Sequence, residues 1–351
     1  MPAFDTYSHD QYLRKWTLSL GGSGGGSLTG TGSAGGELVL TTETQGLDLR
    51  MRFDIRQADV QTPNTAIIRV YNLSDDTARS VIDEFDQVTL QAGYITGNYG
   101  VIFKGTIKQY KRGRESAIDS YLDIFAADGD QAHNEATVNK TLAAKSTLQT
   151  QADELRKSQQ AAQPGLGVGN ATPSGLPGGV LPRGRVLYGM TADEIRTWQQ
   201  NAGASWTIQD GQVEVRGLKE YSPGEVVVLT AQTGLVGVPE ATQDGIHVTC
   251  FLNPAIKVRG RVQLDNSGIN QYFVPGGAPV QGQASSVFPS YTSMNFFASP
   301  SADGTYCVLV IDYEGDTRGL PWYNKMVCLA VDSSSPLGSA VQGIGGFGGS
   351  P

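Results

Sequence analysis

LDLRMRFDIRQ, residues 47–57, alternates apolar and charged side chains without a break. Successive side chains of a β-strand point to opposite faces, so this segment places one apolar row against one charged row. A helix would scatter both sets around its surface, and the alternation therefore predicts a strand. A long strand with one apolar and one charged face is typical of an antiparallel sheet or barrel wall. Its charged face must meet water or a charged partner.

Composition favours a β-rich protein. The chain has 351 residues. At about 150 residues per domain, this length is enough for roughly two domains. Charged residues make up 17% and glycine occurs 45 times. That combination suits many turns and some Gly-rich tracts. The net charge of −8 argues against a nucleic-acid-binding surface, because such a surface needs basic residues.

Three cysteines, Cys250, Cys307 and Cys328, each lie inside an apolar strand-like run. Their number is odd and their spacing wide, so the sequence predicts neither a disulfide framework nor a zinc site. We expect small core residues of a protein made in a reducing cytosol. We also expect no membrane anchor and no secretory export, because the sequence has neither a long apolar span nor a signal-peptide pattern.

The first part of the chain predicts strands and one helix. Residues 1–36 hold a strand at 13–20 followed by a Gly/Ser linker at 21–36. Residues 37–130 predict a first β unit, with strands at 37–41, 47–57, 66–73, 87–94, 100–111 and 117–127. Residues 74–85 predict a helix, with Ser74 as its N-cap. Its apolar stripe comprises Ala78, Val81, Ile82 and Phe85.

The middle of the chain, residues 131–222, predicts a helix and a Gly/Pro-rich linker followed by a small α/β domain. The helix covers 147–160, the Gly-rich stretch 164–179, and a strand 183–189. Thr191 and Glu194 predict a capping box, and Gly203 predicts the end of that helix. Asp210-Gly211 predicts a hairpin between strands 205–209 and 212–216, against which Ile195 and Trp198 would pack.

The last part returns to β structure. Residues 223–333 predict a second β unit, with strands at 225–231, 245–252, 257–264, 306–313 and 325–331. A long loop at 266–303 and a Gly/Ser-rich tail at 334–351 complete the chain. Long loops of this kind often form interfaces.

Several short runs match catalytic or cofactor-binding motifs formally, but the residues around them do not predict the secondary structure that those motifs need. Gly21–Gly25 matches a hydrolase G-x-S-x-G elbow only formally, because Gly and Ser replace the required strand and helix. A G-x-G-x-x-G at 343–348 leaves no room for the helix that a dinucleotide site needs. Asp128-Gly129-Asp130 lacks the spacing of a calcium loop and predicts a turn. We therefore expect no catalytic, cofactor-binding or metal-binding residues.

Single titratable residues give the same result. His9, His133 and His247 are far apart in sequence and match no metal motif. The acid pairs Asp75/Asp76 and Asp83/Glu84 lie on the predicted helix and indicate solvated charge. Catalytic carboxylates can come from distant strands, so a glycosidase stays open in principle, without positive support.

Four runs resemble one protein family. They are MRFDIRQADVQTPNTAIIRVYNLS (51–74), VIFKGTIKQYKRGRES (101–116), TGLVGVPEATQDGIHVTCFLNPAIKVRGRVQLDN (233–266) and YCVLVIDYEGDTRGLPWYNKMVCLAVD (306–332). The amino-acid sequences of these runs, and their order along the chain, resemble the baseplate hub protein of contractile-tailed bacteriophages. That family is distantly related to the amino-terminal part of type VI secretion spikes. The runs cover both β units and leave out the linker, the long loop and the tail.

The resemblance implies a mainly β fold with minor α content: two tail-tube-like β-barrels in one chain, with a small α/β domain inserted between them. It implies a homotrimer whose six barrels form a pseudo-sixfold ring. That ring would join the tail tube protein to the central spike protein, contact other baseplate proteins, and leave a channel through which DNA passes without specific binding. The protein would be a non-enzymatic part of the virion, assembled in the host cytoplasm.

Two other functions stay open from the sequence. Phe288, Tyr291, Phe296 and Phe297, with Trp322-Tyr323, could form the aromatic platform of a carbohydrate-binding or wall-degrading tail protein. Interface or loop packing is the commoner role of such aromatic residues. A plain tail-tube subunit is the third hypothesis, although a single barrel needs only about half of this length.

Overall fold

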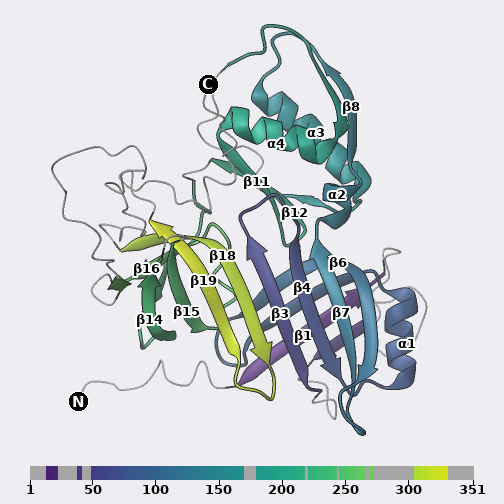
Figure 1. The fold of residues 1–351 in the computed structure, drawn as a ribbon, viewed down its shortest axis with the longest axis vertical. Coiled ribbons are helices and arrows are strands. Elements are labelled where there is room, and N and C mark those ends of the chain that lie inside the picture. The colour runs from purple at the N-terminus through teal and green to yellow at the C-terminus, as the bar shows by residue number, and fades with distance from the viewer. Residues whose placement is uncertain are drawn as a thin grey trace, which may run out of the picture.

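The computed structural model describes residues 13–22, 38–41, 49–169, 179–217, 220–242, 245–265, 269–271 and 304–330. A large β-sheet occupies one end of the molecule, and a small α/β insert stands at the other end (Figure 1). The predicted class, mainly β with minor α, is confirmed. Most of the Gly/Ser linker, most of the loop at 266–303, and the tail lie outside the described residues.

The first β unit, with β1 added from residues 1–36, contains seven strands and one helix, close to the predicted elements. They are β1 (Arg14–Gly21), β2 (Leu38–Thr41), β3 (Met51–Ala58), β4 (Asn64–Tyr71), α1 (Asp75–Glu84), β5 (Gln87–Tyr94), β6 (Tyr99–Arg114) and β7 (Ser120–Asp128). The alternation predicted for β3 is confirmed, because every second residue from Met51 to Gln57 is buried. Residues 47 and 48 lie outside the described part.

Helix α1 begins where its sequence predicted. The Oγ atom of Ser74 accepts a hydrogen bond from the backbone N–H of Thr77 at 3.1 Å, which caps the helix. Val81 is fully buried in the core cluster, and Phe85 packs against that cluster. Ile82 is exposed, so the predicted stripe was too wide by this residue.

The insert combines helices with two small sheets. Its elements are α2 (Asp130–Asn134), β8 (Thr137–Leu142), α3 (Leu148–Ala162), β9 (Gly167–Val168), β10 (Arg185–Met190), α4 (Thr191–Ala202), β11 (Ala204–Gln209) and β12 (Gln212–Gly217). The hairpin β11–β12 turns at Asp210 and Gly211, which both adopt positive φ as its type requires. The ring of Trp198 packs edge-on against that of Trp206 at 5.4 Å, as predicted for this helix and hairpin.

The predicted capping box is wrong. Met190 is the N-cap of α4, and Thr191 is the first residue of the helix. The hydroxyl of Thr191 contacts Ser158 Oγ of α3 at 2.8 Å. Glu194 pairs instead with Arg185 at 3.0 Å. Gly203 ends the helix in the left-handed conformation, as predicted.

The second β unit contains two strands that the sequence did not predict, at 235–241 and at 270–271 within the predicted loop. Its strands are β13 (Val227–Leu229), β14 (Leu235–Ala241), β15 (Ile246–Phe251), β16 (Arg261–Leu264), β17 (Asn270–Gln271), β18 (Thr305–Asp316) and β19 (Trp322–Ala330). β14 escaped prediction because Gly237 and Pro239 interrupt its pattern and a register shift separates Val236 from Glu240. All three cysteines are buried and free, as expected of core residues.

Both β units contribute to one sheet of fourteen strands. Its main order is β17-β14-β15-β19-β18-β3-β4-β7-β6-β5-β1-β2, with β16 beside β18 and β13 beside β16. The units join where β18 pairs antiparallel with β3, from Val310–Ala58 to Asp316–Arg52. Within the described residues, neither unit closes into a barrel by itself.

The two units repeat one topology. In chain order, β1, β3, β4, β5, β6 and β7 correspond to β13, β14, β15, β16, β18 and β19. Across the sheet, β3-β4-β7-β6-β5-β1 corresponds to β14-β15-β19-β18-β16-β13. The final pair differs in direction, because β5–β1 is antiparallel and β16–β13 is parallel.

A repeated irregularity supports this correspondence. The β6–β7 register shifts between Ile107 and Gln109, and the β18–β19 register shifts between Val308 and Val310. In both hairpins, six ladder pairs separate this shift from the turn. Such bulges bend a strand at a defined place, so their shared position indicates one hairpin design used twice.

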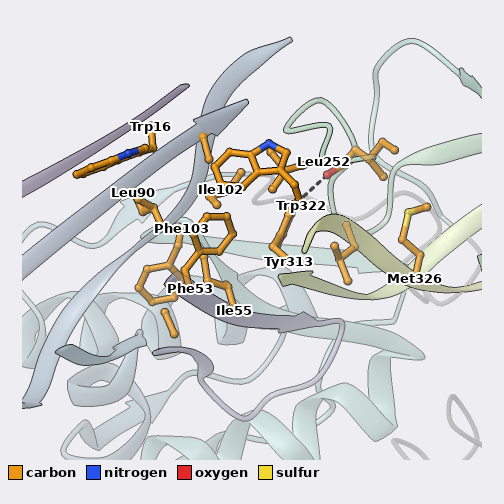
Figure 2. Packing of buried hydrophobic residues seen from close by; sticks show 14 of the residues in the cluster. Trp16, Phe53, Ile55, Leu90, Ile102, Phe103, Leu252, Tyr313, Trp322 and Met326 are labelled. Atoms are coloured by element: carbon orange, nitrogen blue, oxygen red, sulfur yellow. Dashed lines mark hydrogen bonds between the residues drawn. The ribbon is translucent and has the colours of Figure 1, made fainter. Parts of the chain in front are cut away.

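The buried cluster draws on both units. Figure 2 shows Trp16, Phe53 and Phe103 from the first unit close to Tyr313 and Trp322 from the second. The ring of Phe53 meets that of Trp322 edge-on at 5.3 Å, an arrangement that aromatic pairs favour. The hydroxyl of Tyr313 donates to Ile256 O at 2.8 Å. The insert has a separate apolar cluster around Trp198 and Trp206.

Candidate functional site

The open face of the sheet carries the charged row of β3. Arg52, Asp54 and Arg56 are exposed there, as the sequence predicted. Their neighbours on β18 are Asp316, Glu314 and Asp312, so the row lies beside a row of acids. Arg56 and Asp312 approach to 3.7 Å, and Lys325 of β19 pairs with Glu314 at 2.5 Å. These exposed contacts set strand register more than stability, because exposed ion pairs contribute little.

Two arginines at one end of this face make stronger contacts. Arg50 donates two hydrogen bonds to Asp316, at 3.1 and 2.6 Å, and Arg69 donates two to Asp123, at 2.6 and 2.9 Å. Burial raises the pKa of Asp316, but the hydrogen bonds from Arg50 and from backbone N–H groups outweigh it and lower that pKa below its ordinary value. Bidentate pairs of this kind fix side-chain geometry as well as charge.

A buried polar junction joins the insert to the sheet. Arg259 donates from Nε to Asp59 at 2.6 Å, and both residues are only 5% exposed. The same guanidinium donates to Ser205 Oγ on β11 at 3.2 Å and to the backbone carbonyl of Glu220 at 3.1 Å. One side chain therefore connects the β3–β4 loop, the insert hairpin and the segment that leads back to the sheet.

The hairpin turn adds a second set of contacts. Lys257 donates to Asp210 at 2.8 Å and to the backbone carbonyl of Val101 at 2.5 Å. Gln57 of β3 donates to the other carboxylate oxygen of Asp210 and to Ile102 O, both at 3.1 Å. Asn64 of β4 donates to Ile208 O at 2.9 Å. The insert is thus held by side chains of two sheet strands, β3 and β4, and by Lys257 of the loop between β15 and β16.

Asp128, the last residue of β7, also contacts the turn of the insert hairpin. Its side chain is fully buried, and both carboxylate oxygens lie within hydrogen-bonding distance of the backbone N–H of Gly211, at 3.0 and 3.1 Å. Burial raises the pKa of Asp128 to about 8, against the lowering effect of the N–H groups of Gly211 and Asp210. The adjoining Gly129 has a φ of 75°, and a β-carbon there would overlap Ile208.

A polar cleft of about 280 Å³ opens beside the junction. Its charged lining includes Asp59, Asp210, Glu214, Arg216, Lys257 and Arg259. Each cation in this set has an acidic partner, with Arg216 and Glu214 at 2.6 Å. Such a charge-balanced, fully paired lining suits a rigid joint between two parts of the chain.

This junction could not be predicted from the sequence. Asp59 and Arg259 stand 200 residues apart, and neither lies in a recognisable motif. Asp128 and Asp210 were noticed only for their turns. Both turns are present, because Gly129 precedes α2 and Asp210-Gly211 joins β11 to β12. The interaction between these turns depends on the fold and has no local signal.

The candidate catalytic residues stay dispersed. His133 contacts the neighbouring Asn134, and His247 lies exposed on β15, while His9 is outside the described residues. Within the described part of the chain, no three His, Cys, Asp or Glu side chains gather as a metal would require. Asp130 pairs with Lys108, and Asp75 pairs with Arg112. None of the described helices is both long and apolar enough to cross a bilayer.

The aromatic residues proposed for a sugar platform separate into different environments. Trp322 is buried against Phe53, beneath the guanidinium of Arg14. Tyr323 points to the other face of β19 and stacks on Phe251 at 6.1 Å. Phe288, Tyr291, Phe296 and Phe297 lie outside the described residues. Trp322 therefore serves the core and is not part of an exposed platform.

The half of β6 nearer its turn, residues 108–114, is more exposed than the corresponding half of β18. β5 covers β6 only as far as Thr106, and beyond Ile107 that edge meets no further strand among the described residues. Side chains from Lys108 to Arg114 are exposed or half-buried on both faces. The corresponding half of β18 is mostly buried, because β3 of the other unit pairs with its edge.

Comparisons with known proteins found one matching family and several proteins of similar fold. A family model described as Baseplate hub gp41 matches residues 37–274. The 43 kDa tail protein of prophage MuSo2 from Shewanella oneidensis is 7% identical, with a TM-score of 0.52 over 92% of this chain and 98% of that chain. The tail protein of Neisseria meningitidis MC58 is also 7% identical, with a TM-score of 0.50 over 90% and 96%.

A type VI secretion system component from E. coli, the c3393 protein, is 10% identical, with a TM-score of 0.48 over 82% of this chain and 76% of that chain. No curated protein sequence matches the chain. The likeness to the two tail proteins indicates a shared fold, and the family match confirms the resemblance that the four sequence runs suggested.

Proposed function

Because the chain belongs to the Baseplate hub gp41 family, and so to the structural proteins of a phage tail, we propose that it is the hub of a contractile-tail baseplate. Three copies form a ring that adapts the sixfold tail tube to the threefold central spike. The ring leaves a channel for DNA, which passes without specific binding. The hub acts by holding partners in place and catalyses no reaction.

The observation that carries this proposal is the repeated topology. Six strands of the first unit recur in the same chain order and the same sheet order in the second. A chain that contains one unit twice can present six similar units from three copies, which is what a joint between sixfold and threefold partners needs. A plain tail-tube subunit would need the unit only once, so the repeat favours the hub.

The edge of β6 supports ring formation. Within the chain, β3 of one unit covers the half of β18, in the other unit, that lies nearer its turn. The corresponding half of β6 is exposed and carries no strand on that edge among the described residues. We infer that the second unit of a neighbouring copy covers it, because exposed strand edges are otherwise sites of uncontrolled association.

The domain division follows from the same repeat. Residues 37–130 and 223–333 would be the two tube-like units, each closed into a barrel wall by its neighbours in the ring. Residues 131–222, with their own apolar cluster, would form the insert. Of residues 1–36, β1 (Arg14–Gly21) would belong to the first unit, because it pairs with β5. The rest of that stretch and residues 334–351 would lie outside the units.

The assembly is tested by the mass of the purified chain, alone and mixed with the tube and spike proteins of the same phage. We expect a trimer, or a monomer that becomes trimeric when the spike is added. A stable monomer that binds neither partner would refute the proposal. Release of peptidoglycan fragments by the isolated chain would instead favour the wall-degrading alternative, which the burial of Trp322 does not support.

A further inference from the structure

The turns of the two corresponding hairpins are alike in length and in one residue. Five residues connect β6 to β7 (115–119), and five connect β18 to β19 (317–321). The fourth residue is aliphatic in both, Ile118 in the first turn and Leu320 in the second. A small residue precedes each of them, Ala117 and Gly319.

These two side chains are the most exposed large hydrophobic groups in the described part of the chain. Ile118 is 88% exposed and Leu320 is 85% exposed. A single exposed aliphatic side chain is ordinary on a protein surface. Two at the same position of a repeated hairpin, more exposed than every other described aliphatic or aromatic side chain, indicate a shared role.

Both turns lie at the same end of the sheet. β18 is antiparallel to β3, β3 to β4, β4 to β7, and β7 to β6, so β6 and β18 run in the same direction toward their turns. Figure 1 shows both turns at the end of the sheet opposite the insert. Ile118 and Leu320 therefore face the same side of any ring that these units form.

Side chains hold each turn in one conformation. In the first, Ser116 Oγ accepts hydrogen bonds from the backbone N–H groups of Ile118 and Asp119, at 3.3 and 3.0 Å. In the second, Asp316 accepts from the N–H groups of Arg318 and Gly319, both at 3.0 Å.

Arg14 of β1 also stabilises the second turn by hydrogen bonds. It donates to the backbone carbonyls of Asp316 at 2.5 Å and Leu320 at 3.2 Å. Fixed turns present an apolar group at low entropic cost on binding.

The charges around the two turns differ. Glu115 and Asp119 make the first turn acidic, while Arg318 and Arg14 make the second basic. A partner that recognised charge would distinguish the two turns. The features that the turns share are the aliphatic side chain, the small residue before it, and a fixed backbone.

We propose that Ile118 and Leu320 are equivalent apolar contacts for a partner ring with six like sockets, which is the tail tube in the function proposed above. A threefold partner would meet the two turns in different places and would not require the same chemistry from both. This inference rests on the proposed function and assigns the tube-facing side to the end opposite the insert.

The test measures co-sedimentation of the full-length chain with tubes assembled from the tail-tube protein of the same phage. We expect Ile118→Asp and Leu320→Asp each to weaken tube binding at least about tenfold, and the double variant to abolish it. Ile118→Leu and Leu320→Ile should bind as the unchanged chain does. Tyr188→Asp is the matched control, because Tyr188 is 75% exposed but lies on the insert, and it should not alter binding.

The outcomes separate this inference from the proposed function. The equivalence of the turns is wrong if the unchanged chain binds tubes and both aspartate variants bind equally well, or if only one of the two substitutions weakens binding. In either case the proposed hub function still stands. If the unchanged chain does not bind tubes, the tube-adaptor function fails and this contact fails with it. Two further variants, Ile118→Ser and Leu320→Ser, remove the apolar side chain without adding charge. A thermal midpoint equal to that of the unchanged chain, measured for each variant, excludes misfolding as the cause of lost binding.

Discussion

Replacing Arg259 by alanine tests whether the buried junction holds the insert on the sheet. The change leaves Asp59, only 5% exposed, without its cation, and also removes donors to Ser205 and to the carbonyl of Glu220. Breaking a buried ion pair from one side costs about 3–5 kcal/mol. Arg259 has a φ of 63°. Alanine keeps the β-carbon that makes this conformation costly, so backbone strain does not change.

The matched control is Arg56→Ala on the open face. Arg56 lies 3.7 Å from Asp312, and both side chains are substantially exposed. The loss of this pair should therefore cost about 0–1 kcal/mol. Urea unfolding of both variants, followed by tryptophan fluorescence, compares the two losses in unfolding free energy. Trp206 on the hairpin and Trp322 in the sheet core report on the two sides of the junction.

The double variant Asp59→Leu/Arg259→Met sharpens the result. If the cost of Arg259→Ala comes from a stranded carboxylate, an apolar pair of similar size should recover most of the stability. Equal losses for Arg259→Ala and Arg56→Ala would refute the view that this junction fixes the insert. So would a double variant no more stable than Arg259→Ala.

Three further outcomes follow from single residues. Burial raises the pKa of Asp128 to about 8 from an ordinary 3.8, so its contribution to stability is complete below the lower value and is lost as pH rises through the higher. Asp128→Asn should flatten the decline in thermal midpoint between about pH 4 and 8, and an unchanged decline would contradict this. Gly315→Ala should cost about 1–3 kcal/mol in urea unfolding, because the new β-carbon would overlap the ring of Phe53; a neutral effect would mean that this part of the core is loosely packed. Ser74→Ala should cost about 1 kcal/mol by removing the cap on Thr77 N–H, and a loss of helix signal far beyond one turn would show that all of α1, not just its first turn, depends on this cap.

Local patterns predicted most strands and helices because their causes are local. The alternation through Met51, Phe53 and Ile55 reflects burial of one face, and the cap at Ser74 reflects unpaired N–H groups in the first helical turn. Asp210-Gly211 marked its hairpin because few residues tolerate positive φ at two successive positions. Local evidence misled where a side chain found a more distant partner, as Glu194 did with Arg185, and where Gly237 and Pro239 interrupted the pattern of β14.

Arrangements that depend on distant pairing could not be predicted. The joining of β18 to β3 brings together segments from the first and last parts of the chain and turns two expected units into one sheet. The contact of Arg259 with Asp59 depends on three segments that meet only after folding. The equivalence of Ile118 and Leu320 needed the strand order of both units, because the sequences around the two turns have little in common.

In the proposed hub, one chain supplies two similar units to a pseudo-sixfold ring. Electron cryomicroscopy of the assembled baseplate, with this chain located in the map, tests it most directly. We predict three copies whose six β units are evenly spaced around the channel, with the turns at Ile118 and Leu320 facing the tail tube. Six copies in the ring, or three copies whose first and second β units lie at different heights and radii, would contradict it.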